Sequence, residues 1–423
     1  MRSRILFLSQ CLPFPPDSGV TRRTFHILRE LQREFDVTLV AFSRRGHQPD
    51  ADSVTRAAAA LRRELSEVMN PVRINSEFSL AFKLRNHAWS VMTGEPYIFH
   101  EYGDPRFGQE LEQAVRARPD LIHLDSLDLY RWLSSLPKLP TACTHHSIES
   151  ELLRLEAAHV SSRVVRTYIR HQADLVEKVE QRLCPRFDLN VMTSEIDAQR
   201  LRAFARGART TVIPNGVDTD FFRPETRASI VPGRIVFLGP TYMFPNRDAV
   251  DFFLAAAWPL VRQRFPQSTF HLVGKNSVDE KARFESNPEV TCNGHVPDIR
   301  PHLREAAVSI VPIRAGGGTR LKILDSWAMA KAVVSTSVGC EGLDTRDGHN
   351  ILIRDDPGEF AAAVVQVLRD PELRERLGRE ARKTVEDQYG WPVVGRKLVA
   401  HYQDLVISPT AAALSERAAG RHP

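Results

Sequence analysis

Three consecutive glycines and two cationic side chains lie close together in the second half of the chain. They follow a short apolar run at 308–313 and open a helical pattern that contains Asp325. Glycine lets backbone N–H groups approach a ligand, and the first turn of a helix carries partial positive charge. Two cations at this position lower stability unless they share an anion. The pattern predicts a phosphate site, whose residues are Gly316, Gly317, Gly318, Thr319, Arg320 and Lys322. The alternative is a tightly packed glycine loop in which Lys322 pairs with Asp325 on a solvated helix face.

Two adjacent histidines, His145 and His146, end a second apolar run at 141–146. Successive side chains of a strand point in opposite directions, so one imidazole can face a ligand while the other packs. Glu149 follows within one helical turn. Gly19 ends a proline-rich loop after the first apolar run and falls at the same predicted sheet edge, where open α/β sheets bind ligands. The alternatives are structural histidines and a simple helix-entry turn at Gly19.

These candidate residues depend on two stretches of alternating strands and helices for their positions. Strands are expected at 4–9, 36–42, 65–72, 121–126, 141–146, 189–194 and 210–215 in the first half, and at 234–239, 268–274, 290–294, 308–313, 332–336 and 351–354 in the second. Long helices are expected at 20–34, 148–186, 246–264, 357–368, 371–387 and 391–405. The alternation predicts two α/β domains with parallel sheets and a ligand cleft between them.

The turn-rich connector after residue 215 sets the predicted boundary. We expect an N-terminal domain at 1–215, a linker at 216–232, a C-terminal domain at 233–388, a helix at 389–407 and a disordered tail at 408–423. A literal Asp-x-Asp, Asp218 to Asp220, falls in this connector and is interpreted as structural.

The totals exclude several classes of protein. The 423 residues carry a net charge of only +5, and no nucleic-acid-binding motif occurs, so nucleic acid is not an expected partner. The five cysteines are widely spaced and are expected to be reduced thiols, and no metal-binding cluster is seen. Neither a secretory signal nor a membrane-length apolar run occurs, which favours a cytoplasmic location. The segment 78–89 mixes aromatic and basic residues; we favour a core-facing helix and keep peripheral contact with the inner membrane surface as the alternative.

The order and spacing of short motifs resemble those of the retaining glycosyltransferases of family 4, which have the GT-B fold. The motifs are PFPPDSG at 13–19, HHSIE at 145–149, TSEID at 193–197, VIPNGVD at 212–218, FLG at 237–239, PN at 245–246, LVG at 272–274, GGGTRLK at 316–322 and VGCEG at 338–342. Within the family, the chain is most similar to sugar transferases of bacterial exopolysaccharide and exosortase-associated clusters. The resemblance also implies that the C-terminal helix crosses back to the first domain.

The resemblance implies a hexosyltransferase that moves a sugar from a nucleotide-diphosphate sugar to a glycan or lipid-linked acceptor in exopolysaccharide or cell-surface glycan biosynthesis. It implies no cofactor and no metal, because Arg320 and Lys322 would hold the diphosphate and neutralise the charge of the leaving group. His146 would act on the sugar, and the other donor-binding residues would be Gly19, Asn246, the turn at 316–319, Asp325 and Glu341.

Three positions depart from the family pattern. Asp325 stands where the second of two family glutamates is usual; it is shorter but still able to accept from a ribose hydroxyl. Gly317 stands where the family often has a glutamate, so Glu341 or the backbone amides of the glycine turn are expected to take that contact with the sugar. Pro240 stands where an arginine is usual; the alternatives are that Arg247 replaces it or that Arg320 alone suffices. A non-catalytic nucleotide-sugar-binding protein and a sugar-nucleotide epimerase of the same fold therefore stay as alternatives.

Overall fold

The computed structural model describes residues 2–225, 230–315 and 320–407, which form two compact units. Unit 1 takes Met1–Pro214 together with the C-terminal residues from Val394, and unit 2 takes Asn215–Val393. The predicted glycine turn, with Gly316, Gly317, Gly318 and Thr319, and the predicted tail at 408–423 lie outside the described residues.

The sheet of unit 1 has the order β3-β2-β1-β5-β6-β7-β8, with β4 also paired to β2, and each pairing is parallel. Its strands are β1 Arg4–Ser9, β2 Asp36–Ser43, β3 Glu67–Val68, β4 Val72–Arg73, β5 Leu121–Leu124, β6 Thr141–His145, β7 Leu189–Met192 and β8 Thr210–Val212. The expected strand at 65–72 is thus two short strands. The central strands are buried on both faces, which explains why they read as continuous apolar runs.

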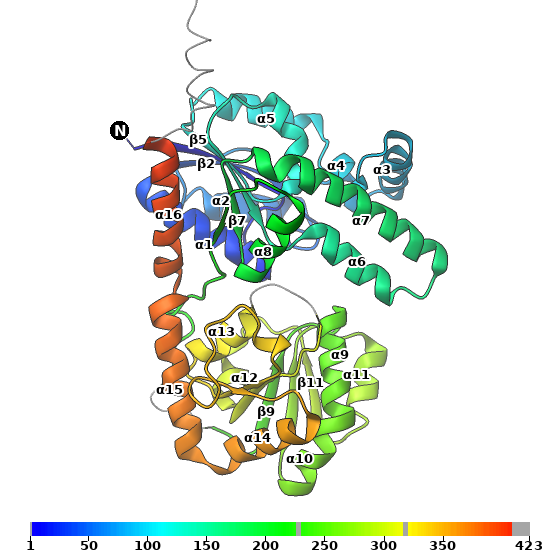
Figure 1. Cartoon of the computed structure of the whole chain (residues 1–423), viewed down its shortest axis with the longest axis vertical. Coiled ribbons are helices and arrows are strands. Elements are labelled where there is room, and N and C mark those ends of the chain that lie inside the picture. Colours follow the sequence, from blue (N-terminus) through cyan, green and yellow to red (C-terminus); the bar gives the residue numbers. More distant parts are fainter. Residues whose placement is uncertain (1, 226–229, 316–319, 408–423) are drawn as a thin grey trace, which may run out of the picture. The chain divides into compact units, whose positions relative to one another are not determined.

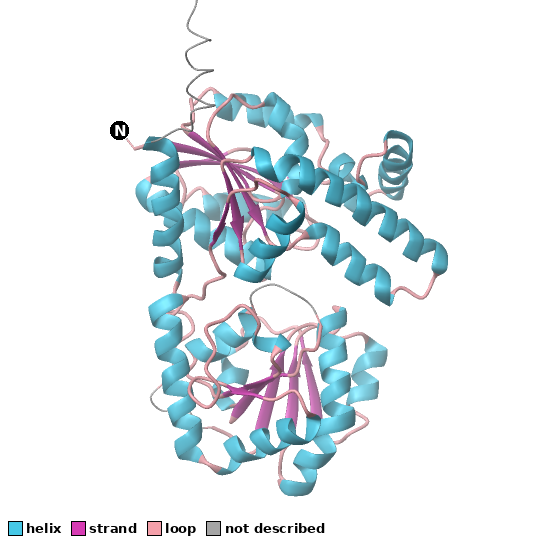
Figure 2. Cartoon of the chain, in the orientation of Figure 1, coloured by secondary structure: helices cyan, strands magenta, loops and turns pink. Residues whose placement is uncertain are grey.

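The helices of unit 1 cover both faces of this sheet (Figures 1 and 2). They are α1 Gly19–Glu34, α2 Ala51–Leu61, α3 Leu80–Thr93, α4 Tyr97–Glu101, α5 Pro105–Val115, α6 Glu149–His159, α7 Arg163–Leu183 and α8 Glu195–Phe204. The prediction of one helix at 148–186 is wrong. The chain turns after α6, where Val160 is extended, and the Ser162 side chain starts α7 by accepting a hydrogen bond from the Val165 amide.

Unit 2 contains a parallel sheet of order β11-β10-β9-β12-β13-β14. Its strands are β9 Arg234–Leu238, β10 Thr269–Val273, β11 Val290–Gly294, β12 Val308–Val311, β13 Val333–Ser335 and β14 Leu352–Ile353. Its helices are α9 Phe244–Phe252, α10 Trp258–Arg264, α11 Val278–Phe284, α12 Arg300–Glu305, α13 Leu321–Ala328, α14 Pro357–Arg369 and α15 Pro371–Gln388. A π-helical turn at Phe253–Ala257 joins α9 to α10, just before Pro259, which lacks a backbone donor.

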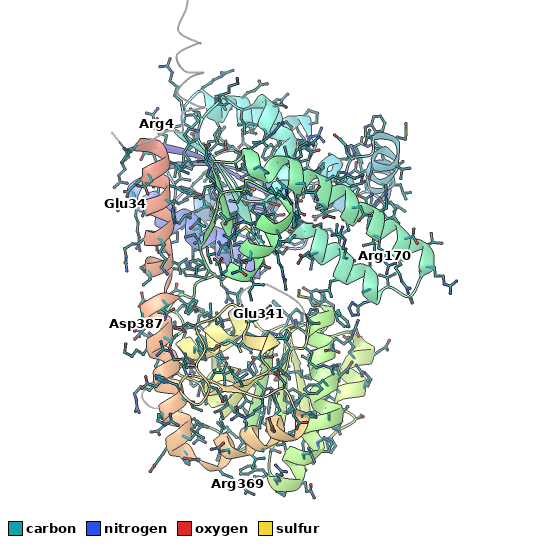
Figure 3. The ribbon with its side chains drawn as sticks, in the orientation of Figure 1. Arg4, Glu34, Arg170, Glu341, Arg369 and Asp387 are labelled. Carbon is teal, nitrogen blue, oxygen red and sulfur yellow. The ribbon has the colours of Figure 1, made fainter. Side chains whose placement is uncertain are left out.

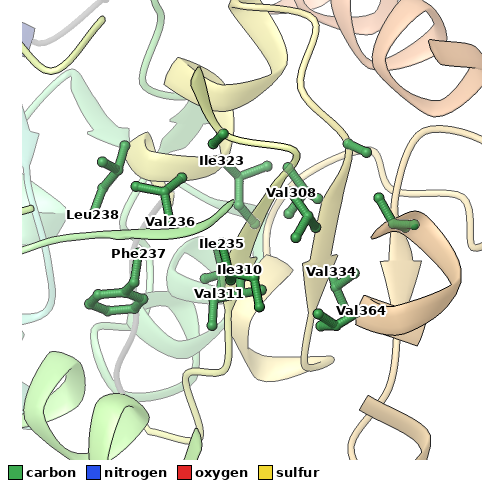
Figure 4. Close-up of a cluster of buried hydrophobic side chains, with 14 of the residues drawn as sticks. Ile235, Val236, Phe237, Leu238, Val308, Ile310, Val311, Ile323, Val334 and Val364 are labelled. Carbon is green, nitrogen blue, oxygen red and sulfur yellow. The ribbon is translucent and has the colours of Figure 1, made fainter. Parts of the chain in front are cut away.

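The core of unit 2 lies between this sheet and its helices. Figure 4 shows side chains of β9, β12 and β13 packed together with Ile323 of α13 and Val364 of α14. Because Ile323 and Leu324 are fully buried, the start of α13 is fixed against the sheet. This packing positions Arg320 and Lys322. The predicted pair of parallel-sheet α/β domains is confirmed.

The last helix, α16 Trp391–Ile407, begins in unit 2, and its residues from Val394 belong to unit 1. Within unit 1, Tyr402 is fully buried and its hydroxyl is hydrogen-bonded to Nδ1 of His123. All five cysteines are buried and unpaired, as expected for reduced thiols. Among the described residues, none of the helices has both the length and the apolar sequence that a membrane span requires.

Candidate functional site

A buried carboxylate and a partly exposed imidazole meet at the carboxyl edge of the unit 1 sheet. Asp125, which follows β5, accepts hydrogen bonds at Oδ2 from the hydroxyls of Thr24 at 2.7 Å and Ser9 at 3.1 Å. Its other oxygen, Oδ1, lies 3.6 Å from Nε2 of His146. Burial favours the neutral acid, but His146, His123 and the hydrogen bond from Thr24 outweigh it, so the pKa of Asp125 is lowered. The charged carboxylate therefore holds the His146 ring.

His123 of β5 is a fully buried neighbour of this site. Its ring stacks on Phe7 at a centroid distance of 4.2 Å, and its Nε2 is hydrogen-bonded to the Thr144 hydroxyl at 3.2 Å. Complete burial lowers the pKa of His123 to about 3, so the ring is neutral at physiological pH. His123 is therefore a structural histidine and leaves Asp125 available to His146.

The two adjacent histidines divide as the strand alternation predicts. His145 is buried, and its Nε2 donates to Oδ1 of Asn190 at 3.0 Å. Burial lowers the pKa of His145 to about 4. His146 keeps 13% of its side chain exposed and turns toward Asp125. Of the pair, only His146 can meet a ligand without rearrangement of the core.

Glu149 begins α6 and accepts a hydrogen bond from the Ser147 hydroxyl at 3.0 Å. Burial, with a smaller contribution from Asp128, raises the pKa of Glu149 to about 8.

Gly19 is the exposed first residue of α1, and Ser18 and Thr21 form a capping box around it. The first turn of α1 contains no acidic residue, so its partial positive charge is not neutralised within the helix.

The second set of residues lies in unit 2, around the Lys322 ammonium. Nζ of Lys322 donates to Oδ1 of Asn246 at 2.6 Å and lies 4.1 Å from the centroid of the Phe237 ring. Burial, followed by the nearby Arg320, lowers the pKa of Lys322 well below its ordinary value. No described carboxylate forms an ion pair with this lysine. The ammonium is thus held by a neutral amide and a ring face beside a second cation.

Arg320 is the residue before α13, and only 9% of it is exposed. Its Nη2 donates to the carbonyl oxygen of Val338 at 3.3 Å. This contact ties Arg320 to the 3₁₀ turn Val338–Cys340, which is followed by the half-buried Glu341. Arg320, Lys322 and the Glu341 segment therefore belong to one region of unit 2, and Glu341 is labelled in Figure 3.

The remaining predicted residues have defined surroundings. Asp325 is buried on α13, at 4% exposure. Nη1 of Arg247 lies 3.9 Å from Oε1 of Glu280, so the charge of Arg247 is partly neutralised by this carboxylate. Glu280 also accepts a hydrogen bond from the Thr241 hydroxyl at 2.7 Å. Asp218 accepts from the amides of Asp220 and Phe221 within its own turn, which agrees with a structural role for this Asp-x-Asp.

Sequence reasoning missed Asp125, Phe237 and the role of Gly239. Asp125 lies near the end of the strand predicted at 121–126 and could have been found as an acidic residue at the sheet edge that carries His146. A side chain added at Gly239 would lie 2.9 Å from Nδ2 of Asn246 and 3.0 Å from Nζ of Lys322. This glycine therefore leaves room for the Lys322–Asn246 pair.

Two family models match the chain. The one described as Glycosyltransferase Family 4 matches residues 18–221, and the one described as Glycosyl transferases group 1 matches residues 232–370. The chain belongs to the glycosyltransferases of family 4. The second match includes Lys322, Arg320 and Asn246, and the first includes Asp125 and His146.

Known relatives agree with the family. A phosphatidyl-myo-inositol mannosyltransferase of Mycobacterium tuberculosis is 28% identical over 49% of this chain and 57% of its own length. The chain thus spans a little over half the length of this relative. Two solved structures share the fold. Sucrose-phosphate synthase from Thermosynechococcus elongatus has a TM-score of 0.69 and 17% identity, and the match covers 96% of this chain and 100% of that one. Anabaena HepE in complex with UDP has a TM-score of 0.66 and 16% identity, and the match covers 95% of this chain and 100% of that one. The GT-B fold is confirmed.

Proposed function

We propose that this family-4 chain transfers a hexose, with retained anomeric configuration, from a nucleotide-diphosphate sugar to a glycan or lipid-linked acceptor. The transfer serves exopolysaccharide or cell-surface glycan biosynthesis, and it needs no metal ion. The proposal assigns the diphosphate to unit 2 residues and the contact with the sugar to His146.

The surroundings of Lys322 carry this proposal. The Lys322 ammonium is half-buried, lies beside a second cation and is held by a neutral amide and a ring face, which is unfavourable in the free protein. A diphosphate would supply the missing negative charge, restore the ordinary pKa of Lys322 and form charge-assisted hydrogen bonds. The same two cations would stabilise the charge that develops on the leaving diphosphate, which is the part that a metal ion plays in other enzymes.

The Asp125–His146 pair supplies the second half of the chemistry. The buried carboxylate fixes the ring through Nε2, and the exposed part of the imidazole is available for a hydrogen bond to a sugar hydroxyl. Since Asp125 is itself held by Thr24 and Ser9, the ring is oriented before a ligand binds. Such prior orientation contributes to the rate because no reorganisation is required during the reaction.

The relatives favour a uridine nucleotide and a lipid-linked acceptor. HepE was solved with UDP, and the mycobacterial relative is named for mannosyl transfer to phosphatidyl-myo-inositol. UDP-sugars are therefore the first donors to test with this chain, followed by GDP- and dTDP-sugars.

The deciding experiment measures UDP affinity by calorimetry and donor turnover for the wild type, Arg320→Ala and Lys322→Ala. Each substitution removes one charge-assisted contact, so UDP affinity should fall by roughly 10- to 100-fold. Turnover of the wild type should persist in EDTA. Wild-type affinity and turnover in both variants would remove the phosphate role from these residues.

Lys331 provides a matched control, because it is a buried lysine in the same unit with a different role. Its Nζ donates to the carbonyl oxygens of Arg304 at 2.7 Å and Ala306 at 3.2 Å. Lys331→Ala should lower stability without changing UDP affinity.

A non-catalytic binding protein is the second candidate, since Pro240 and Gly317 replace donor-site residues of the family. UDP binding without turnover of any donor would favour it.

A further inference from the structure

Helix α3 has its polar and apolar faces reversed relative to an ordinary surface helix. Its two buried residues are polar, Asn86 and Ser90. Its large apolar side chains face solvent with 51% to 76% of their area exposed; they are Leu80, Leu84, Trp89, Val91 and Met92. The prediction of a core-facing amphipathic helix is wrong. Figure 1 shows α3 at the edge of unit 1, next to α4.

Ser90 and His87 on the inner face of α3 are hydrogen-bonded to neighbouring segments. The Ser90 hydroxyl donates to the carbonyl oxygen of Glu95 at 2.6 Å and accepts from Nε2 of Gln172 at 2.9 Å. Nδ1 of His87 is hydrogen-bonded to the Tyr168 hydroxyl at 2.7 Å. Because α7 holds α3 by these contacts, the apolar face is presented outward in the stable arrangement and is not the result of a loosely attached helix.

The charged side chains of α3 itself have one sign, and the exposed Glu95 follows just beyond the helix. No acidic residue occurs from Phe78 to Gly94, and Lys83 and Arg85 project from the exposed part of α3. Arg85 lies over the Phe82 ring at 4.5 Å from its centroid, and Arg73 lies over the Phe78 ring at 3.9 Å. The cations are thus spread beside aromatic rings, which is typical of segments that lie at a membrane surface.

The first turns of α7 continue the same character. Val164 is 80% exposed, Val165 is 46% exposed, and residues 160–173 contain no acidic side chain. Arg163 and Arg170 extend from this part of α7, which reaches the outer end of the α6–α7 hairpin in Figure 3. The helix that anchors α3 therefore adds cations and apolar side chains on the same unit.

We propose that the exposed side of α3 docks on a bilayer that contains anionic phospholipids, with Leu84, Trp89 and Met92 inserted among the lipids and Lys83 and Arg85 at the headgroups. A second copy of this chain would place like charges opposite each other across the contact, which disfavours self-association. An anionic bilayer complements both the cations and the apolar side chains. This inference concerns where the protein works and does not rest on the proposed transfer reaction.

Vesicle flotation tests the proposal with the full chain. Vesicles of phosphatidylcholine mixed with an equal amount of phosphatidylglycerol should carry the protein, and vesicles of phosphatidylcholine alone should carry much less. Two double variants should each weaken binding by at least about tenfold: Leu84→Gln with Trp89→Gln, and Lys83→Gln with Arg85→Gln. For the second variant, the expected loss follows from roughly fivefold per cation near an anionic surface. Raising the salt concentration should weaken binding of the wild type.

Matched controls remove the same chemistry elsewhere. Val278 is 86% exposed in unit 2, and Arg379 and Lys383 are exposed cations of α15. Val278→Gln, and Arg379→Gln combined with Lys383→Gln, should bind vesicles as the wild type does. All α3 variants should keep the melting temperature, UDP affinity and donor hydrolysis of the wild type, since these residues are exposed and lie outside the candidate site.

Three outcomes would overturn the proposal. One is equal binding to neutral and anionic vesicles, and another is wild-type binding by both α3 double variants. The third is a dimer in solution that Leu84→Gln and Trp89→Gln convert to a monomer without vesicle binding, which would assign the face to a second copy. None of these outcomes bears on the proposed transfer reaction, which is tested separately by the Arg320 and Lys322 variants.

Discussion

Nε2 of His146 lies 3.6 Å from Oδ1 of Asp125, at the carboxyl ends of two neighbouring strands. β5 and β6 pair in parallel, with Leu124 opposite Cys143, so the residues that follow each strand emerge at one sheet edge. The carboxylate is fully buried and ionised, whereas the imidazole is partly exposed. The pair therefore combines a fixed charge with a ring that a ligand can reach.

Asp125→Asn should lower turnover strongly while leaving UDP affinity unchanged. The amide keeps the size of the side chain but removes the charge that orients His146. We expect turnover to fall on the order of 10²-fold, as when one preorganised electrostatic contact is lost. Initial rates of donor hydrolysis and UDP calorimetry on the same preparation measure the two effects separately.

Ser9→Ala separates the role of the charge from the role of the fold. It removes one donor to the other carboxylate oxygen and leaves the contact with His146 in place. The variant should lose about 1 kcal/mol of unfolding free energy and keep most of its turnover. Asp125 would be purely a structural residue if, in both variants, the loss of turnover were in the same ratio to the loss of unfolding free energy.

Much of the fold could be read from the sequence, because strands buried on both faces appear as apolar runs. The run predicted at 234–239 is β9, and the helix predicted at 371–387 is α15. The break between α6 and α7 was missed, because three residues around Ser161 are enough to turn the chain and their effect on the helical pattern is small.

The contacts of the candidate site required the structure. Lys322 and Asn246 are 76 residues apart, and only the sheet order brings α13 and the start of α9 together. The outward face of α3 could not be predicted either. Apolar residues at helical spacing normally face a core, and nothing local shows that Ser90 and His87 find their hydrogen-bond partners on α7, more than 75 residues away.

Gly239→Ala should weaken donor binding through the Lys322–Asn246 pair. Gly239 has a φ of +141°, and an added Cβ would lie 3.0 Å from Nζ of Lys322. The substitution should displace the ammonium and lower UDP affinity by roughly tenfold, the value of one charge-assisted hydrogen bond. Isothermal calorimetry with UDP measures the change.

Gly294→Ala is the control for backbone strain. Gly294 has a φ of +68°, and an added Cβ would meet open space. Both alanine variants should lose about 1 kcal/mol or more of unfolding free energy, since alanine disfavours positive φ. Only Gly239→Ala should lose UDP affinity; an equal loss in Gly294→Ala would show that strain in the sheet edge, and not Lys322, controls binding.

Glu149→Gln should remove a loss of stability that occurs as the pH rises. The unfolded side chain ionises near its ordinary value, 4.5, whereas the folded one keeps its proton up to about 8. Between these values the folded state binds more protons than the unfolded state, so wild-type stability falls as the pH increases from 4.5 to 8. The variant should show a smaller decline and be more stable than the wild type at pH 8 and above.

Urea unfolding at several pH values measures this difference. Glu112→Gln, at an exposed position of α5, is the control and should follow the wild type at every pH. Parallel pH profiles for the wild type and Glu149→Gln would mean that the folded Glu149 side chain is solvated and ionises as the unfolded one does.

Gly395→Ala should loosen the attachment of α16 to α1. A Cβ at this position would lie 2.4 Å from both Cβ and Cγ of Glu30, atoms close to the backbone that cannot move aside easily. The overpacking should cost about 1–3 kcal/mol of unfolding free energy, against roughly 1 kcal/mol gained from helix propensity. Gly390→Ala, whose nearest new contact would be 3.8 Å, should be nearly neutral. Urea midpoints decide between them: a Gly395→Ala protein more stable than the wild type would show that the close approach of α16 to α1 is not required for the fold.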